Sequence, residues 1–348
     1  MGFYRVNPIS DPRWTALVEK HPLSSVFHTV PWLQALERTY GYSSVAFTNS
    51  SPNEKLENGA VFSRVRSWLT GQRLVSLPFS DYCDFLFDSA ENLDLLARYL
   101  RSTLDNEAWK YIEVRPTEPD RGKILDKFKF HSSSEYVLHR IDLQRDSNSI
   151  FKSFDKDSIQ RRIRRAERAH LTEKSGRSEC LLKDFYDLLV ITRSRHQVPP
   201  QPYEWFHNLT GGFGDALEIR VAYKESTPVA AILTLRFKDK VYYKYGGSDR
   251  TFNNLGATPL LLWRAVEEAK FNGAVEFDLG RTDADNQGLI AFKDKWGSSS
   301  RPLVYLRLSS SSLARGNELK LKMMKKIFAR MPPRLLEFTG KLIYRHIG

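Results

Sequence analysis

The spacing of apolar residues predicts that each half of the chain mixes helices with strands. In the first half, apolar residues recur at helical spacing over residues 31–40 and 92–104. Shorter apolar runs, bounded by polar residues or glycine, predict extended segments. These strands are expected at residues 60–65, 73–77, 111–114 and 136–143. The first half is therefore predicted to be an α/β unit.

The second half opens with a strongly patterned segment, residues 155–170. At 100° per residue, one face of a helix over this segment carries Ile159, Ile163, Ala166 and His170. The opposite face carries the arginines Arg161, Arg164, Arg165 and Arg168. The segment is predicted to be a helix with one buried face and one strongly basic face.

The remaining pattern predicts, in order, helices, antiparallel strands, a helix and a strand, before a final helix and strand without set bounds. The helices are expected at residues 184–195 and 258–271, and the strands at 217–223, 229–237, 240–245 and 275–279. The predicted fold class is α/β (α+β), with mixed, mainly antiparallel sheets flanked by helices. Three parts are expected: an N-terminal domain over 1–150, a second domain over 151–308 and a helical tail over 309–348.

The positive charge is concentrated in two segments of the second half. The formal net charge of the chain is +12. Residues 1–150 hold 18 Lys and Arg against 19 Asp and Glu, whereas residues 151–348 hold 35 against 22. Most of the excess lies in residues 156–170 and in the tail. Such local basicity favours an anionic partner.

The chain has the composition of a protein of the reducing cytoplasm. It has no apolar run close to the roughly 18–20 residues that span a bilayer, and its N-terminus does not have the pattern of a secretory signal. The two cysteines, Cys83 and Cys180, lie far apart without metal-type spacing. We therefore expect a cytoplasmic protein with neither a disulfide nor a zinc site.

The tail is predicted to form an amphipathic helix. Its apolar side carries Leu319, Met323, Met324, Ile327, Phe328 and Met331, and its basic side carries Lys322, Lys325, Lys326 and Arg330. This pattern is typical of helices that lie on anionic membranes. Residues 316–345 are therefore expected to contact the inner face of the cytoplasmic membrane. Packing against the domain is the alternative.

Residues 241–297 hold most of the chemistry-bearing positions. Leu255-Gly256-Ala257 leads into a helix, so Gly256 and Ala257 could present backbone N–H groups to an anion; a glycine needed for conformation alone is the alternative. Gly246-Gly247 suits either the close approach of a ligand or a hairpin exit. On the strand before them, Tyr243 and Tyr245 are expected to share one face.

The end of this block contains two candidate catalytic residues. Asp278 is followed by Arg281 and could accept a proton, although a structural Asp–Arg pair is equally plausible. Lys293, beside Phe292, could stabilise a developing oxyanion, with a solvated helix lysine as the alternative. The acidic residues from 283 to 294 lack the final glutamate of a calcium loop, so calcium is rejected and no metal is expected.

Six segments, taken in order, resemble the FemAB-like branch of the GNAT acyltransferase superfamily. That branch includes peptidoglycan-bridge aminoacyltransferases and BioF2-like acetyltransferase domains of envelope and exopolysaccharide gene sets. The segments are SLPFSDYC (76–83), FDKDSIQRRIRRAERAHL (154–171), TRSRHQVPPQPYEWF (192–206), YYKYGGSD (242–249), LGATPLLLWRAVEEA (255–269) and EFDLGRTDADNQGLIAFKDKWG (276–297).

The resemblance implies tandem GNAT-like domains with a cleft between them, and transfer of an activated acyl or aminoacyl group to a primary amine. It implies a catalytic role for Lys293. It also implies that Tyr243 or Tyr245, and Arg193 or Arg195, help to hold the acceptor. Phe292 and Arg281 are likewise expected to bind substrate.

The resemblance leaves the donor open between acyl-CoA and aminoacyl-tRNA, neither of them a tightly bound cofactor. The loop Asn253–Thr258 departs from the full coenzyme A pattern, whereas the face formed by Arg161, Arg164, Arg165 and Arg168 favours tRNA. The expected acceptor is an amine of a cell-envelope or exopolysaccharide precursor at the membrane face. The alternative is a non-catalytic membrane- or RNA-binding protein on a degenerate GNAT scaffold.

Overall fold

The computed structural model describes residues 2–309, 339–340 and 343–346. The tail predicted over residues 309–348 therefore lies largely outside the described residues, and so does most of its proposed membrane-binding helix. In the part of the chain that is described, no helix has the length and apolar character needed to cross a membrane. The chain forms two compact units, and each is described by itself.

Unit 1 comprises Met1–Tyr136, Pro302–Lys320 and Lys341–Gly348. Its strands are ordered β1-β2-β3-β4-β5, followed by the part of β12 that belongs to this unit. Neighbouring strands are antiparallel except for β4 and β5, which are parallel. Its elements are β1 (Tyr4–Val6), α1 (Pro12–Lys20), α2 (Val30–Tyr40), β2 (Ser43–Thr48), β3 (Ala60–Ser67), β4 (Gly71–Val75), α3 (Ala90–Asn106), β5 (Tyr111–Val114) and α4 (Pro119–Asp126).

Two helices of unit 1, α2 and α3, form where they were predicted, whereas α1 and α4 were not predicted. The apolar face of α3 buries Leu93, Leu96, Ala97, Leu100 and Leu104 in a core shared with β2–β5. Ser89 caps this helix by accepting a hydrogen bond from the backbone N–H of Asn92. The predicted helix at 31–40 is α2, which ends at Gly41 in the left-handed conformation.

Unit 2 comprises Val137–Arg301 and Leu321–Gly340. Its strand order is β6-β11-β10-β9-β8-β7. The elements are α5 (Ser147–Ser153), α6 (Arg161–Arg168), β7 (Thr172–Gly176), α7 (Glu179–Arg195), α8 (Tyr203–Phe213), β8 (Leu217–Lys224), β9 (Thr227–Phe237), β10 (Lys240–Ser248), α9 (Ala257–Phe271), β11 (Glu276–Asp283) and α10 (Gln287–Asp294). Two further strands, β6 (His131–Asp142) and β12 (Ser299–Ser309), contribute residues to both units.

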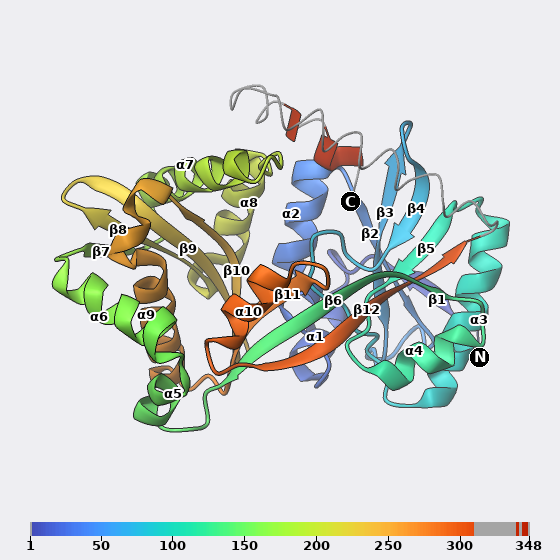
Figure 1. The fold of residues 1–348 in the computed structure, drawn as a ribbon. Coiled ribbons are helices and arrows are strands. Elements are labelled where there is room, and N and C mark those ends of the chain that lie inside the picture. The colour runs from blue at the N-terminus through green and yellow to red at the C-terminus, as the bar shows by residue number, and fades with distance from the viewer. Residues whose placement is uncertain (1, 310–338, 341–342, 347–348) are drawn as a thin grey trace. The chain divides into compact units, whose positions relative to one another are not determined.

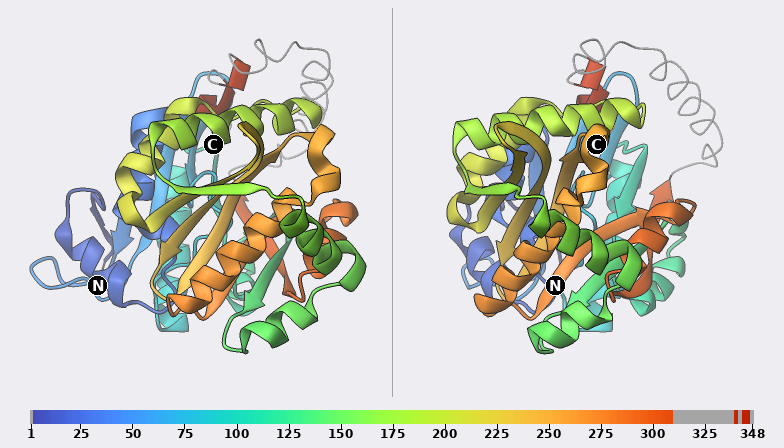
Figure 2. Two further views of the ribbon diagram at one scale, coloured as in Figure 1. Left: turned by 90° about the vertical axis from the view of Figure 1, so that its left-hand side faces the viewer. Right: turned by 60° about the vertical axis from the view of Figure 1, so that its left-hand side comes forward.

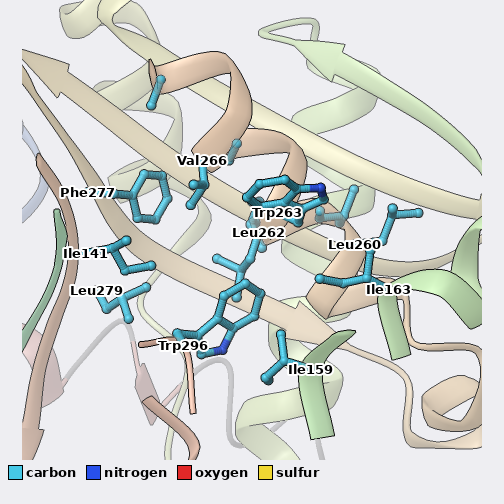
Figure 3. Close-up of a cluster of buried hydrophobic side chains, with 14 of the residues drawn as sticks. Ile141, Ile159, Ile163, Leu260, Leu262, Trp263, Val266, Phe277, Leu279 and Trp296 are labelled. Atoms are coloured by element: carbon cyan, nitrogen blue, oxygen red, sulfur yellow. The ribbon is translucent and has the colours of Figure 1, made fainter. Parts of the chain in front are cut away.

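Helices cover both faces of the unit 2 sheet (Figures 1 and 2). Helix α7 packs on β8, β9 and β10. Helix α9 packs on the same three strands, and α6 packs on α9. The core on the α9 side contains Trp263 and Trp296, with Ile159 and Ile163 from the α6 segment (Figure 3). This arrangement confirms the predicted mixed, mainly antiparallel sheets flanked by helices. The predicted domain boundaries at 150 and 308 stay a prediction.

The basic helix is shorter than predicted. Residues 156–160 form a π-helical turn, α6 proper runs from Arg161 to Arg168, and Ile159, Ile163 and Ala166 are buried as expected. His170 was expected on the buried face, but it is exposed and has a φ of 51°. The helix ends before His170 because the chain turns there to enter β7.

Candidate active site

The candidate site lies where strands β10 and β11 separate. Their parallel pairing runs from Lys240/Glu276 to Tyr242/Asp278, although β10 continues to Ser248 and β11 to Asp283. Beyond the last pair, β10 remains paired with β9 through a register shift between Tyr243 and Tyr245. The backbone of β11 that follows Asp278 is therefore available to contacts other than the β10 ladder.

A local turn in β11 presents two carbonyl groups to the helix that follows it. Gly280 has a φ of 72°, a conformation that favours glycine. The Oδ1 atom of Asp278 accepts a hydrogen bond of 2.7 Å from the Gly280 N–H. The carboxylate is only 1% exposed, and its Oδ2 atom lies 3.4 Å from Nε of Arg140 on β6. Asp278 thus holds the β11 turn in place.

Lys293 extends from α10 onto this turn. Its Nζ donates hydrogen bonds to the carbonyl oxygens of Gly280 (2.9 Å) and Arg281 (3.1 Å). The side chain is 6% exposed, so the lysine is buried and is not the solvated helix lysine that the sequence left as an alternative. The two carbonyl dipoles offset the cost of burying the ammonium group.

The position of Lys293 is fixed by the end of α10. Asn286 caps the helix start by accepting a hydrogen bond from the N–H of Leu289. Trp296, which follows the helix, is 0% exposed and packs among Ile159, Leu262 and Leu279 (Figure 3). The carbonyl of Lys293 also accepts hydrogen bonds from the N–H of Trp296 and from Oγ of Ser298.

A buried histidine lies in the same region. His139 on β6 is 0% exposed, and its Nε2 lies 3.2 Å from Oδ1 of Asp294 on α10. Burial lowers the pKa of His139, and the charge of Lys293 lowers it further, whereas Asp294 raises it. Lys293 therefore lies within electrostatic range of a histidine whose neutral form is favoured.

The two strand tyrosines do not share a face, which corrects the expectation from simple alternation. Tyr243 pairs with Thr234 and Tyr245 with the next residue, Leu233, so Lys244 forms a bulge. Tyr243 packs against the core on the α9 side. Tyr245 packs against Phe206 on the other side, and its hydroxyl accepts a hydrogen bond from Trp205.

Tyr243 and Arg193 come within electrostatic range of each other. Burial raises the pKa of Tyr243 to about 12, while the positive charge of Arg193 opposes that rise. Arg193 is half-buried near the end of α7, whereas Arg195 is exposed beside His196. Which tyrosine and which arginine hold the acceptor stays a prediction.

The glycine pair after these tyrosines serves helix packing. A Cβ at Gly247 would lie 2.5 Å from the backbone of Leu188 and Leu189 on α7, and one at Gly246 would collide with the Tyr243 hydroxyl. Both glycines are explained by the close approach of protein atoms. Neither the ligand approach nor the hairpin exit that the sequence suggested is needed to account for them.

Phe292 and Arg281 adjoin Lys293. Phe292 packs against the unit 2 core, with its ring 6.3 Å from that of Trp296. Arg281 is half-buried, and its guanidinium lies 4.0 Å from Asp283. Their proposed contact with substrate stays a prediction.

The turn before α9 is contacted by the arginine helix. Gly256 has a φ of 77°, and a Cβ there would lie 2.4 Å from the backbone oxygen of Arg162. Arg165 donates a hydrogen bond to the carbonyl of Asn254. The structure thus brings together Gly256, Ala257 and Arg165. The positive φ and the close approach of Arg162 explain the need for glycine at position 256 without a ligand.

The four predicted phosphate-binding arginines are exposed on α6. Arg161 pairs with Asp157 at 2.6 Å, Arg164 lies over the ring of Phe151, and Arg168 donates to the Arg164 carbonyl. The three side-chain contacts are local to the helix and its immediate neighbours. The face therefore carries a strong positive charge toward solvent.

A separate cavity of about 340 Å³ contains none of the predicted site residues. It follows β8 and the C-terminal half of α9, and it includes the buried Arg220. Arg220 forms ion pairs with Glu173, Glu218 and Glu268. These ion pairs link β7, β8 and α9.

Three residues of the site were not recognised in the sequence: His139, Arg140 and Asp294. His139 and Arg140 lie in a strand that was predicted, and a histidine on its buried face was the available signal. Asp294 was considered only as a calcium ligand. Its contact with His139 depends on α10, a helix that the pattern predicted in order but without bounds.

Comparisons with known proteins point to one superfamily. Residues 154–293, a segment that ends at Lys293, match the family model described as "Acetyltransferase (GNAT) domain". A UDP-N-acetylmuramoylpentapeptide-lysine N(6)-alanyltransferase of Weissella viridescens is 28% identical over 132 residues, which cover 38% of this chain. The match spans 35% of the length of that curated relative.

Solved structures are similar over most of the chain. The crystal structure of FemX gives a TM-score of 0.70 at 16% identity, covering 93% of this chain and 100% of FemX. The structure of L-PGS from Bacillus licheniformis gives a TM-score of 0.58 at 14% identity, covering 92% of this chain and 98% of L-PGS. A tandem GNAT protein from the clavulanic acid biosynthesis pathway gives a TM-score of 0.57 at 9% identity, covering 89% of this chain and 98% of that protein. These likenesses confirm the predicted fold class.

Proposed function

We propose that the protein is an N-acyltransferase of the FemAB-like branch of the GNAT superfamily, because residues 154–293 match a GNAT acetyltransferase domain and the chain is similar to an alanyltransferase and to FemX. It would transfer an acyl or aminoacyl group from an activated donor to a primary amine. The observation that carries the proposal is the buried Lys293, whose Nζ binds the Gly280 and Arg281 carbonyls where β10 and β11 separate.

The chemistry follows from this placement. Attack of an amine on an activated carbonyl places negative charge on the carbonyl oxygen. A buried cation held at a fixed position stabilises that charge more than a solvated one does, because little reorganisation accompanies the reaction. Lys293 is thus proposed as the oxyanion-stabilising residue. Tyr243 and Arg193 are proposed to orient the acceptor.

Asp278 is given two possible roles that an experiment separates. Its carboxylate accepts a hydrogen bond from the Gly280 N–H and lies beside Arg140, and the same β11 turn presents the carbonyls that bind Lys293. We favour a role in positioning Lys293. The role of general base, expected from the sequence, requires the carboxylate to reach the acceptor amine directly.

The acceptor is proposed to be an amine of a cell-envelope or exopolysaccharide precursor. The alanyltransferase of Weissella viridescens acts, by its name, on the lysine of a UDP-N-acetylmuramoylpentapeptide, which supports an envelope precursor. The basic amphipathic pattern of 316–345 supports work at the cytoplasmic membrane face. The donor is proposed to be acyl-CoA or aminoacyl-tRNA.

The test is acyl transfer by Lys293 variants. Lys293→Ala should lower kcat by about 10²–10³-fold, the usual effect of losing an oxyanion-stabilising group. Lys295→Ala, an exposed lysine two residues later, should leave kcat unchanged. A Lys293→Ala variant that folds and retains full turnover would exclude the catalytic role.

The alternative function is a non-catalytic binding protein on the same scaffold. The exposed arginine face of α6 favours it, because such a face binds phosphates whether or not chemistry follows. That function predicts salt-sensitive RNA or membrane binding that is unaffected by Lys293→Ala and Asp278→Asn. A turnover measurable above background with any acyl donor would reject it.

A further inference from the structure

The turn between β3 and β4 exposes two large apolar side chains. Trp68 is 87% exposed and Leu69 is 55% exposed, between the last residue of β3, Ser67, and the first residue of β4, Gly71. Single exposed apolar residues are common on soluble proteins. Two adjacent large apolar residues at an exposed turn are less common, and the turn does not need them in order to form. The turn is entirely within unit 1.

Hydrogen bonds hold this turn in one conformation. Oγ of Ser67 accepts hydrogen bonds from the N–H groups of Leu69 (3.1 Å) and Thr70 (3.0 Å). Ser67 is itself buried. The apolar pair is therefore presented by a rigid turn, so little conformational entropy is lost when the pair is buried against a partner.

The described residues 343–346 lie against the same turn. His346 contacts it through three interactions: Nδ1 lies 3.0 Å from Oγ of Ser67, its carbonyl accepts from Oγ1 of Thr70 at 2.7 Å, and its ring packs edge-on to Trp68. The end of the basic C-terminal sequence thus lies beside the exposed apolar pair.

Exposed cations accompany the apolar pair. Arg66 lies two residues before Trp68, Lys110 donates a hydrogen bond to the Thr70 carbonyl, and Arg345 precedes His346; all three are exposed. The carboxylates closest to Lys110 in sequence, Glu107 and Glu113, are ion-paired with arginines. The rim of the turn is therefore positively charged.

We propose that the β3–β4 turn is a membrane-docking element that inserts Trp68 and Leu69 into the interfacial region of an anionic bilayer. Tryptophan favours that region because its ring is apolar and its N–H remains hydrated. The cations around the turn complement anionic headgroups. A stable protein partner requires about 800 Å² on each side, far more than two adjacent side chains provide.

The inference goes beyond the proposed acyl transfer and does not depend on it. It assigns membrane contact to a described element of unit 1, in addition to the tail suggested by the sequence. An acyl-transfer assay with a soluble amine therefore separates the two proposals. The turn variants should retain full turnover in that assay.

The tryptophans of this chain allow a direct measurement. The other six are at most 7% exposed: Trp14, Trp32, Trp109, Trp205, Trp263 and Trp296. Brominated phosphatidylcholine in phosphatidylglycerol-containing vesicles quenches a tryptophan only on contact. We expect quenching in the full-length protein and its loss in Trp68→Phe, which should still bind. Equal quenching in Trp68→Phe, or no binding of the full-length protein, would overturn the proposal.

Vesicle flotation tests the energetic role of the turn. The double variant Trp68→Ser with Leu69→Ser should bind anionic vesicles about tenfold more weakly, since most of the inserted apolar area is removed. The matched control is Phe271→Ser, which removes an 89% exposed apolar residue at the end of α9 and should bind normally. Undiminished binding of the double variant would refute insertion.

Two further experiments test whether the tail alone binds the membrane and whether this surface binds a second copy of the chain. Neutralising Lys322, Lys325, Lys326 and Arg330 tests the tail; if this variant alone loses binding, the turn is not a docking element. Gel filtration without vesicles tests self-association. A dimer that becomes a monomer in the Trp68/Leu69 double variant would show that the surface binds a second copy, and would also overturn the proposal.

Discussion

Asp278 binds the Gly280 N–H, and the carbonyls of Gly280 and Arg281 bind Lys293, so the β11 turn links the two side chains. Substitutions at Asp278 distinguish its two proposed roles. The variant Asp278→Asn keeps an oxygen that can accept the Gly280 hydrogen bond, whereas Asp278→Ala does not. If Asp278 positions the turn, Asn should lower kcat by about tenfold or less, and Ala should lower it further.

A general base gives a different result, because an amide cannot take up the proton. Asn and Ala would then both lower kcat by about 10²–10⁴-fold. The measurement is kcat for both variants, with thermal unfolding as a check that each variant folds. Equal, large losses in both variants would exclude the positioning role.

His139 makes stability depend on pH. Its pKa in the folded protein is lowered by burial from an ordinary value of about 6.5. Just below pH 6.5, His139 is therefore protonated more readily in the unfolded chain than in the folded protein. The free energy of unfolding should fall as the pH drops below about 6.5, until the lowered pKa is reached, and this contribution is constant above 6.5.

Urea unfolding of the wild type and His139→Asn between pH 5 and 8 measures this effect. The difference between the two proteins isolates His139 from the other histidines. We expect a shallower loss of stability at acid pH in the variant. Parallel curves would mean that His139 is readily protonated in the folded state.

At the scale of single residues, the sequence indicated Lys293 and Asp278 but not their environment. Alternation along the chain cannot reveal a bulge, so it placed Tyr243 and Tyr245 on one face when the extra residue Lys244 places them on opposite faces. The burial of Lys293 depends on Trp296 fixing the end of α10 in the core. Such placement is a tertiary effect that residue types alone do not encode.

At the scale of elements, the close contact between α6 and the turn before α9 gives a stability prediction. Gly256→Ala combines an unfavourable φ of 77° with a Cβ only 2.4 Å from the Arg162 oxygen. The backbone conformation costs about 1–2 kcal/mol, and overpacking adds about 1–3 kcal/mol. We expect a loss of about 2–5 kcal/mol in the free energy of unfolding.

Gly273→Ala is the matched control for this variant. Gly273 has a φ of 80°, but a Cβ there would meet nothing within 4 Å. It should lose only the conformational part, about 1–2 kcal/mol. Chemical unfolding of both variants measures the difference, and equal losses would show that α6 moves away at little cost.

Long periodic elements were predictable from sequence and short or internal ones were not. The predicted helices at 31–40, 92–104 and 258–271 correspond to α2, α3 and α9, because each has a sustained apolar face. The pattern predicted a helix after the strand at 275–279 but not its bounds, and it did not predict β7. Helix α10 has only eight residues and buries Lys293, and β7 is an exposed edge strand, so neither shows a clear apolar period.

At the scale of the whole molecule, the uneven charge predicts how the donor is recognised. If the donor is aminoacyl-tRNA, replacing Arg161, Arg164, Arg165 and Arg168 by Gln should weaken binding. The magnitude of the slope of log affinity against log salt should fall by roughly 3, because each of the four lost phosphate contacts contributes about 0.7–0.9. A control that neutralises Arg98, Lys123, Lys127 and Lys129, exposed on unit 1, should keep the slope.

Filter binding with charged tRNA at several salt concentrations measures both variants. An acyl-CoA donor carries few phosphates and would give a small slope in every protein. An unchanged tRNA slope in the α6 variant would therefore exclude this face as the tRNA contact. A thermal-shift screen with coenzyme A thioesters completes the comparison.

The division of the chain into units has a consequence for the order of its synthesis. Unit 1 takes residues from both ends of the chain, and unit 2 is mostly the continuous stretch Val137–Arg301 between them. Strand β5 pairs on one side with β4, but its other partner is β12, through Leu306↔Val114 and its neighbours. On the ribosome, β5 therefore remains an open edge until all of residues 137–301 have been made. The N-terminal unit is begun first and completed last.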